Sequence, residues 1–219
     1  MIKRLKPLFI ILGVIILLFS IVAVLFSVNR IKTKRIDNEY SYLFSESKLE
    51  SIKIENVPLI KQDVSCGYAI IEMLSDFYGS KTTEKDLYER NNHKVSTQST
   101  KGFVKEINKT IPNKSYEAFE YLKNDELLIK INESLKNGNP VAVEWAAKLD
   151  DTWTIHWSIV TGMDKDHIYI NNPYGYKEVL TYSEFISRTT FKAFEKMPLL
   201  YSFGFALGLF SKNTIIIAK

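Results

Sequence analysis

Residues 57–79 read VPLIKQDVSCGYAIIEMLSDFYG and contain the single cysteine of this 219-residue chain. Within this stretch, apolar residues recur with the spacing of one face of an amphipathic helix, at positions 69, 70, 73, 74 and 77. Ser65 occupies the position of an N-cap, and Gly79 stands where a helix commonly ends. The stretch therefore predicts a helix from Cys66 to about Tyr78, with the thiol in its first turn.

Further helices and then strands are predicted on the carboxyl side of this helix. Helical patterns cover 84–91, 100–109 and 125–137. After Pro140, the segments VAVEWAA, TWTIHWSIVTGM and HIYI are rich in β-branched and aromatic residues, which is typical of strands. NNPYGYKE indicates a turn, TYSEFISRTT a short helix, and 213–218 a last strand. A helical half before a stranded half is the order of an α+β domain.

An uncharged apolar segment precedes the domain. Leu8–Val28 spans 21 residues, which as a helix would be roughly 30 Å long, the thickness of a bilayer's hydrocarbon core. The segment is longer than the apolar region of a signal peptide and lacks a small-residue cleavage site. We therefore expect an uncleaved membrane anchor in residues 1–35, a polar linker in 36–56 and a folded domain in 57–219.

Basic residues flank the apolar segment on both sides, so the positive-inside rule does not decide its orientation. Because single N-terminal anchors commonly leave the body of the protein outside the cytoplasm, we expect an extracytoplasmic domain at a bacterial cell membrane. A second apolar stretch, Met197–Phe210, has only 14 residues and contains a proline and two glycines. It is too short to cross a bilayer, and we expect it to be buried structure.

Composition excludes several classes of protein. One cysteine rules out a disulfide framework and a cysteine-rich zinc module, and paired short ligand spacings for a metal are lacking. Seven of the 29 Lys and Arg residues lie in 1–35, so the remaining 22 are set against all 25 acidic residues. The folded part is slightly acidic and lacks a basic cluster, which argues against nucleic-acid binding.

The cysteine has two interpretations. A thiol at a helix N-terminus meets the positive end of the helix dipole and unpaired N–H groups, which stabilise the nucleophilic thiolate. Cys66 is otherwise a small buried hydrophobic residue, the commonest fate of a free cysteine. Gly67 favours the nucleophile, because the absence of a Cβ lets a substrate backbone approach the sulfur.

Three further residues complete a site for nucleophilic catalysis. His156 alternates with Trp153, Ile155 and Trp157 along a predicted strand, which makes it a candidate general base or, alternatively, a hydrogen-bonded strand histidine. The side-chain oxygen of Asn172 can accept from an imidazole N–H and orient it, although asparagine before proline is also common in turns. The side chain of Gln62 can donate to a developing oxyanion, although the residue is alternatively an ordinary exposed loop glutamine.

The order of these motifs resembles that of the bacteriocin-processing (double-glycine leader) cysteine peptidases and their standalone relatives. The motifs are Gln62, then Cys66-Gly67 at the start of a helix that ends in Tyr-Gly, then His156 on a strand, and Asn172-Pro173 after the next strand. The resemblance covers about 57–188. It implies a papain-like fold, an N-terminal helical half packed on an antiparallel sheet. It also implies that Cys66 is the nucleophile, His156 the base and acid, Asn172 the orienting group and Gln62 the oxyanion donor, with no cofactor. The family usually has Asp where Asn172 stands.

Together with the anchor predicted from Leu8–Val28, the resemblance implies a membrane-anchored cysteine peptidase that acts on a peptide or protein substrate. The chain has no ATP-binding glycine-rich loop, so we do not expect it to be a transporter of the kind that carries such a peptidase. Two alternatives are a catalytically inactive, membrane-tethered binding module on the same scaffold, and a Cys-His transpeptidase or cell-wall amidase.

Overall fold

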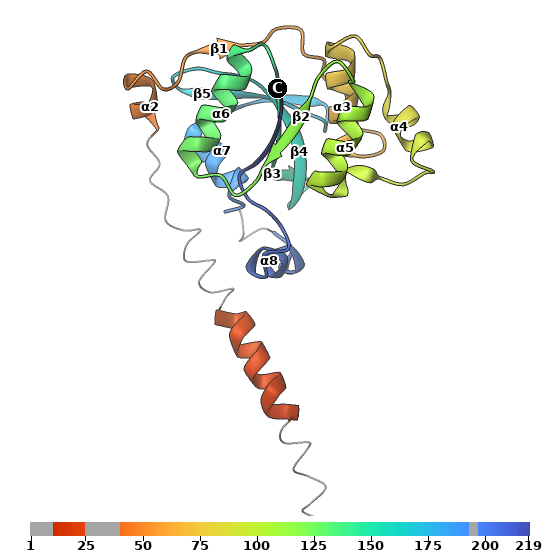
Figure 1. Ribbon diagram of the computed structural model, residues 1–219. Helices are drawn as coiled ribbons and strands as arrows, with labels where there is room; N and C mark the ends of the chain where they lie inside the picture. Colours follow the sequence, from red (N-terminus) through yellow and green to blue (C-terminus); the bar gives the residue numbers. More distant parts are fainter. Residues whose placement is uncertain (1–10, 25–39, 193–196) are drawn as a thin grey trace, which may run out of the picture.

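The computed structural model describes residues 11–24, 40–192 and 197–219 and has an α+β fold (Figure 1). Its helices beyond residue 40 are α2 (Ser41–Ser45), α3 (Cys66–Phe77), α4 (Glu84–Arg90), α5 (Thr100–Thr110), α6 (Asn124–Lys136), α7 (Tyr182–Thr189) and α8 (Leu199–Ala206), with a 3₁₀ turn at Ser96–Gln98. Its strands are β1 (Ile52–Lys53), β2 (Tyr116–Phe119), β3 (Val141–Leu149), β4 (Thr152–Met163), β5 (His167–Asn172), β6 (Tyr176–Thr181) and β7 (Thr214–Ala218).

The strands form one sheet in the order β2-β7-β3-β4-β5-β6, with β1 paired to the end of β4. Every pairing between described strands is antiparallel. The long hairpin of β3 and β4 pairs Val141 with Val160 and continues to its tip. β5 pairs with β4 only from Ile159 onward. The first half of β4, which contains His156, therefore has no strand beside it on that edge.

Two groups of helices cover the sheet (Figure 1). α3, α4 and α5 pack on one face through a core that includes Ile70, Phe103 and Trp157. α2, α6 and α7 pack on the other through a core that includes Trp145 and Phe185. Alternate residues of the central strands point to opposite faces, so neighbouring β4 residues contribute to different cores.

The predicted helices from Cys66 to 137 and the predicted β-hairpin strands agree with the structure to within one or two residues. The boundary of the domain was wrong. Part of the predicted linker belongs to the fold, because Tyr40, Leu43 and Leu49 are buried and β1 joins the sheet. The segment predicted as a turn after β5 is a tight turn followed by a sixth strand, β6.

The predicted anchor Leu8–Val28 lies partly outside the described residues. Within it, residues 11–24 are helical. A search of the described residues finds no helix with both the length and the apolar character needed to cross a bilayer.

The stretch Met197–Phe210, predicted as buried, is buried only in part. Its helix α8 buries Ser202, Gly204 and Phe205. Four of its leucines are exposed, because α8 contacts the domain along a single side.

Candidate active site

The thiol of Cys66 lies at the N-terminus of α3, as the capping pattern predicted. The hydroxyl of Ser65 accepts a hydrogen bond from the backbone N–H of Tyr68, which fixes the first turn. The helix then runs into the core, where Tyr68 and Ile70 are fully buried. Cys66 is therefore held on a rigid element, at the edge of the sheet.

A buried carboxylate holds the loop that leads into the cysteine. Glu84, the first residue of α4, accepts hydrogen bonds from the backbone N–H groups of Asp63, Val64 and Ser65 at 2.9–3.0 Å. Three such bonds to one carboxylate fix the backbone between Gln62 and Cys66. This role of Glu84 was missed from the sequence, because an acidic residue in the first turn of a helix is ordinary.

The sulfur of Cys66 lies beside the backbone of β4. The backbone N–H groups of Trp157, the residue after His156, and of Gly67 and Cys66 lie near enough to the sulfur to act on its ionisation. These donors favour the thiolate, but burial raises the pKa of the thiol above its ordinary value and outweighs them. The net direction is opposite to the effect of the helix N-terminus alone, because desolvation is the larger effect.

His156 and Asn172 are in direct contact. Nε2 of His156 lies 2.9 Å from Oδ1 of Asn172, and both residues are buried. The imidazole stacks on the ring of Tyr174, with centroids 4.0 Å apart and planes 24° apart. Burial lowers the pKa of His156 to about 4, although its hydrogen bond with Asn172 works in the opposite direction. The resting pair is therefore a neutral imidazole and a neutral thiol.

Two neighbours fix the orientation of the Asn172 amide. Its Oδ1 also accepts from the backbone N–H of Tyr174 at 2.9 Å, and its Nδ2 donates to Oε1 of Glu178 at 2.7 Å. Because the oxygen faces His156, Nε2 of that ring must carry the proton. The lone pair of the neutral imidazole is then on Nδ1.

Glu178 is fixed in turn by Arg188, whose Nη1 donates to Oε2 of Glu178 at 2.7 Å. The guanidinium lies over the rings of Trp145 and Trp153, 4.8 and 5.1 Å from their centroids. A chain of contacts thus runs from Arg188 through Glu178 and Asn172 to His156. Sequence reasoning missed Glu178 and Arg188, since their role depends on the pairing of β5 with β6 and on α7.

Gln62 lies next to the same turn. Its backbone N–H donates to the carbonyl of Pro173 at 2.7 Å, so the loop before Cys66 is joined to the residue after Asn172. Its side-chain Oε1 is buried without a hydrogen-bond partner. A half-buried amide whose hydrogen-bonding capacity is not used by the fold is suited to a ligand.

A second carboxyl group, missed from the sequence, lies close to the thiol. Glu144 is half-buried on β3, opposite Trp157 in the register, and Ser211 donates to its carboxylate at 3.3 Å. Burial raises the pKa of Glu144 to about 7, and its charge contributes to the raised pKa of Cys66.

The expected role of Gly67 was wrong. The residue is buried, and a Cβ placed on it would lie 2.2 Å from Oγ1 of Thr97 and 2.5 Å from its Cβ. The glycine is therefore required for packing of α3 against the 3₁₀ turn, and the space beside it is filled by protein.

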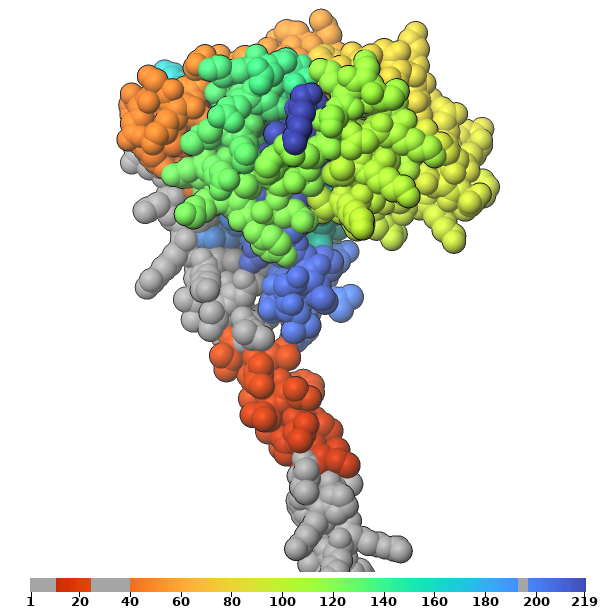
Figure 2. Space-filling view, in the orientation of Figure 1, coloured from red at the N-terminus to blue at the C-terminus, as the bar shows by residue number. Residues whose placement is uncertain are grey.

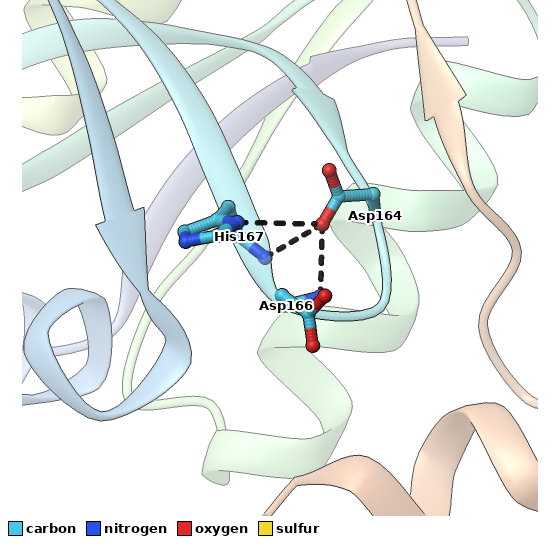
Figure 3. Close-up of side chains that lie close together, drawn as sticks. All are labelled: Asp164, Asp166 and His167. Atoms are coloured by element: carbon cyan, nitrogen blue, oxygen red, sulfur yellow. Dashed lines mark hydrogen bonds and ion pairs between the residues drawn. The ribbon is translucent and has the colours of Figure 1, made fainter.

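The remaining histidines lie elsewhere. His93 is exposed in a loop. His167 opens β5 and forms, with Asp164 and Asp166, a cluster whose ligand atoms lie within 4.8 Å of one another (Figure 3). Oδ1 of Asp164 accepts from the backbone N–H groups of the other two residues, and Oδ2 from the hydroxyl of Tyr169. These bonds account for the cluster as a turn between β4 and β5.

Comparisons with known proteins bear on this arrangement. The sequence model of the Peptidase_C39 like family matches residues 54–198. No curated protein matches the chain. Among solved structures, a C39-like peptidase from Bacillus anthracis is 17% identical with a TM-score of 0.49, and covers 78% of this chain and 98% of its own. A double glycine motif protease from an AMS/PCAT transporter, in complex with the leader peptide, is 15% identical with a TM-score of 0.47 and the same coverages. Because both sequence identities and both TM-scores are low, no inference about function is drawn from these two structures.

Proposed function

The chain belongs to the Peptidase_C39 like family, and on that premise we propose that it is a cysteine peptidase that cleaves a peptide or protein substrate by acyl transfer. Cys66 is the nucleophile, His156 the general base and acid, Asn172 the orienting group and Gln62 an oxyanion donor. The observation that carries the proposal is the fixed amide of Asn172, which leaves the lone pair of His156 on Nδ1.

The resting thiol and imidazole are neutral, so the proton moves during attack. Nδ1 of His156 takes the proton of the Cys66 thiol as the sulfur adds to the peptide carbonyl. The imidazolium then protonates the leaving amine and the C–N bond breaks, which gives a thioester. Water, deprotonated by His156, attacks the thioester and releases the carboxylic acid and the free thiol.

The oxyanion of each tetrahedral intermediate needs preorganised donors. The backbone N–H of Cys66, in the first turn of α3, supplies one. The side-chain amide of Gln62 supplies the other, with its nitrogen toward the substrate. The backbone of the loop that joins them is held by Glu84, which limits movement of this loop during the reaction.

The test is digestion of a degenerate peptide library by the full chain in detergent, read by mass spectrometry, with the Cys66→Ser variant as control. The proposal expects new peptide termini that depend on Cys66. Joined peptides would instead indicate a transpeptidase, and cleavage of muropeptides alone a cell-wall amidase. No Cys66-dependent product from any of these substrates would favour an inactive binding module.

We also propose that Leu8–Val28 tethers the domain to a bacterial cell membrane and that the domain is extracytoplasmic. The support is the length and uncharged character of the segment. Protease accessibility of the domain in intact cells and in permeabilised cells tests the orientation. Digestion before permeabilisation is expected, and protection until permeabilisation would contradict it.

A further inference from the structure

The exposed side of α8 forms an apolar surface. Four leucines on α8 and in the turn after it have exposed fractions of 51–78% and are named here the leucine patch: Leu199, Leu200, Leu207 and Leu209. The helix α8 lies at the margin of the domain and projects from it (Figures 1 and 2). Exposed aliphatic residues so close together commonly mark a site of interaction.

The opposite side of α8 is packed, so the leucines are held outward. The ring of Phe205 lies 4.4 Å from that of Phe191. The ring of Phe210 fills the space above Gly204, where a Cβ would lie 2.1 Å from it. Rotation of the helix to bury the patch would break these aromatic contacts.

We propose that the leucine patch enters the headgroup region of the bilayer to which the N-terminal segment tethers the domain. The proposal rests on the proposed tether. Met197–Phe210 carries no charge, which suits contact with acyl chains. Lys212 follows the stretch, with its Nζ 5.7 Å from the centroid of the Phe205 ring, at the margin where phosphate groups would lie.

The tether favours a bilayer over a protein partner. Eleven residues, 29–39, separate the apolar segment from Tyr40. At about 3.6 Å per residue they reach at most ~40 Å. The domain can therefore never move far from the membrane surface, and a small patch that binds lipid weakly on its own is occupied because its effective concentration is high.

Docking in this way would bring the candidate active site close to the membrane. Phe205 of α8 belongs to the apolar cluster against which Trp153 and Ile155 of β4 pack, and Ile155 directly precedes His156 in the strand. The site would then meet substrates that emerge from the bilayer or lie on its surface, ahead of those in solution.

The test uses the full chain reconstituted into vesicles of phosphatidylcholine and phosphatidylglycerol. The Cys66→Ser substitution removes the one natural thiol of the chain. Leu200→Cys then introduces a single thiol, which carries an environment-sensitive fluorophore. The control is Val179→Cys on β6, which is 55% exposed and lines a groove with Lys53 and Val57. Quenching by lipids with a nitroxide near the top of the acyl chain reports contact with the apolar region.

The proposal expects the label at position 200 to be quenched at least about threefold more than the label at position 179, since an interfacial helix buries its apolar face several Å deep. Equal quenching at the two positions overturns it. A blue shift at 200 without lipid quenching also overturns it, because protein then covers the patch. Flotation of the protein with the vesicles reports the tether separately, so failure of the tether and failure of the patch are distinguishable.

Discussion

Nδ2 of Asn172 donates to Oε1 of Glu178 at 2.7 Å, while Oδ1 of the same amide lies 2.9 Å from Nε2 of His156. The carboxylate can only accept, so it dictates which end of the amide meets the imidazole. An asparagine is uncharged and stabilises an imidazolium less than an aspartate does. We expect the negative charge of Glu178, one residue further out, to replace part of that effect.

Replacement of Glu178 by glutamine is expected to lower kcat on the order of tenfold, the effect of losing one charge-assisted hydrogen bond. The new amide must turn its NH₂ group toward either Arg188 or Asn172, and both already donate. The pH profile of kcat/KM is the diagnostic measurement. Its acid limb should move to lower pH, because the imidazolium of His156 loses a nearby negative charge.

Glu184→Gln is the matched control for that variant. Glu184 also pairs with Arg188, through Nη2 at 2.6 Å, but it is more exposed and does not contact Asn172. We expect its pH profile to stay unchanged. If both variants lost activity equally and neither moved the acid limb, the role of Glu178 would be structural only.

Replacement of Glu144 by glutamine is expected to speed alkylation of Cys66 by iodoacetamide above about pH 7, where the carboxyl of Glu144 is charged. Its negative charge helps to raise the pKa of the thiol. A rise of roughly twofold to fivefold at pH ~8 corresponds to a fraction of a pK unit. At pH values where the carboxyl of Glu144 is protonated, Cys66 should be alkylated at the same rate in the wild type and the variant. A rate increase of the same size at all pH values would contradict this account.

Gly67→Ala is expected to destabilise the domain by about 1–3 kcal/mol, as overpacking does, because its Cβ would meet the side chain of Thr97. Thermal unfolding measures the loss. Thr97→Gly removes the colliding atoms and should recover part of it, so that the two substitutions are not additive. Strict additivity, or lost activity with unchanged stability, would restore the interpretation that a substrate approaches this glycine.

The pKa of His156 predicts a pH dependence of stability. This pKa is lowered to about 4 in the folded state, from 6.5. The contribution of the neutral imidazole to the unfolding free energy is therefore complete above pH 6.5 and is lost as the pH falls from 6.5 through 4. Between these values the wild type should lose about 3 kcal/mol more unfolding free energy than His156→Gln. Urea unfolding in detergent at both pH values measures this. Equal losses would mean that the imidazole is charged in the native state.

Local patterns predicted the parts of the fold that local interactions determine. The cap at Ser65, the apolar spacing through Phe77 and the glycine after Tyr78 all lie within the helix they define. β2 was missed because its partner β7 lies about a hundred residues away, so no short-range pattern marks it. The burial of Leu43 and Leu49 was missed for the same reason, since the polar residues around them indicate a linker.

The candidate site shows the same division. His156 and Asn172 were predicted together, because strand parity and the following proline limit where their side chains point. Glu84, Glu144 and Glu178 were not, since each acts through a neighbour that only the folded chain provides. The raised pKa of Cys66 could not be predicted, because a helix terminus is visible in the sequence and the extent of desolvation is not.

The most direct test of the central claim is labelling of Cys66 at about pH 7 with a peptidyl epoxide, whose ring opens only as a proton is delivered to its oxygen. Iodoacetamide loses iodide without being protonated, so its reaction at about pH 9.5 needs no proton donor and serves as the control for access. If His156 is the base and acid, His156→Ala should slow the epoxide reaction on the order of 100-fold or more and leave the iodoacetamide reaction unchanged. Equal epoxide rates in the two proteins would contradict the account.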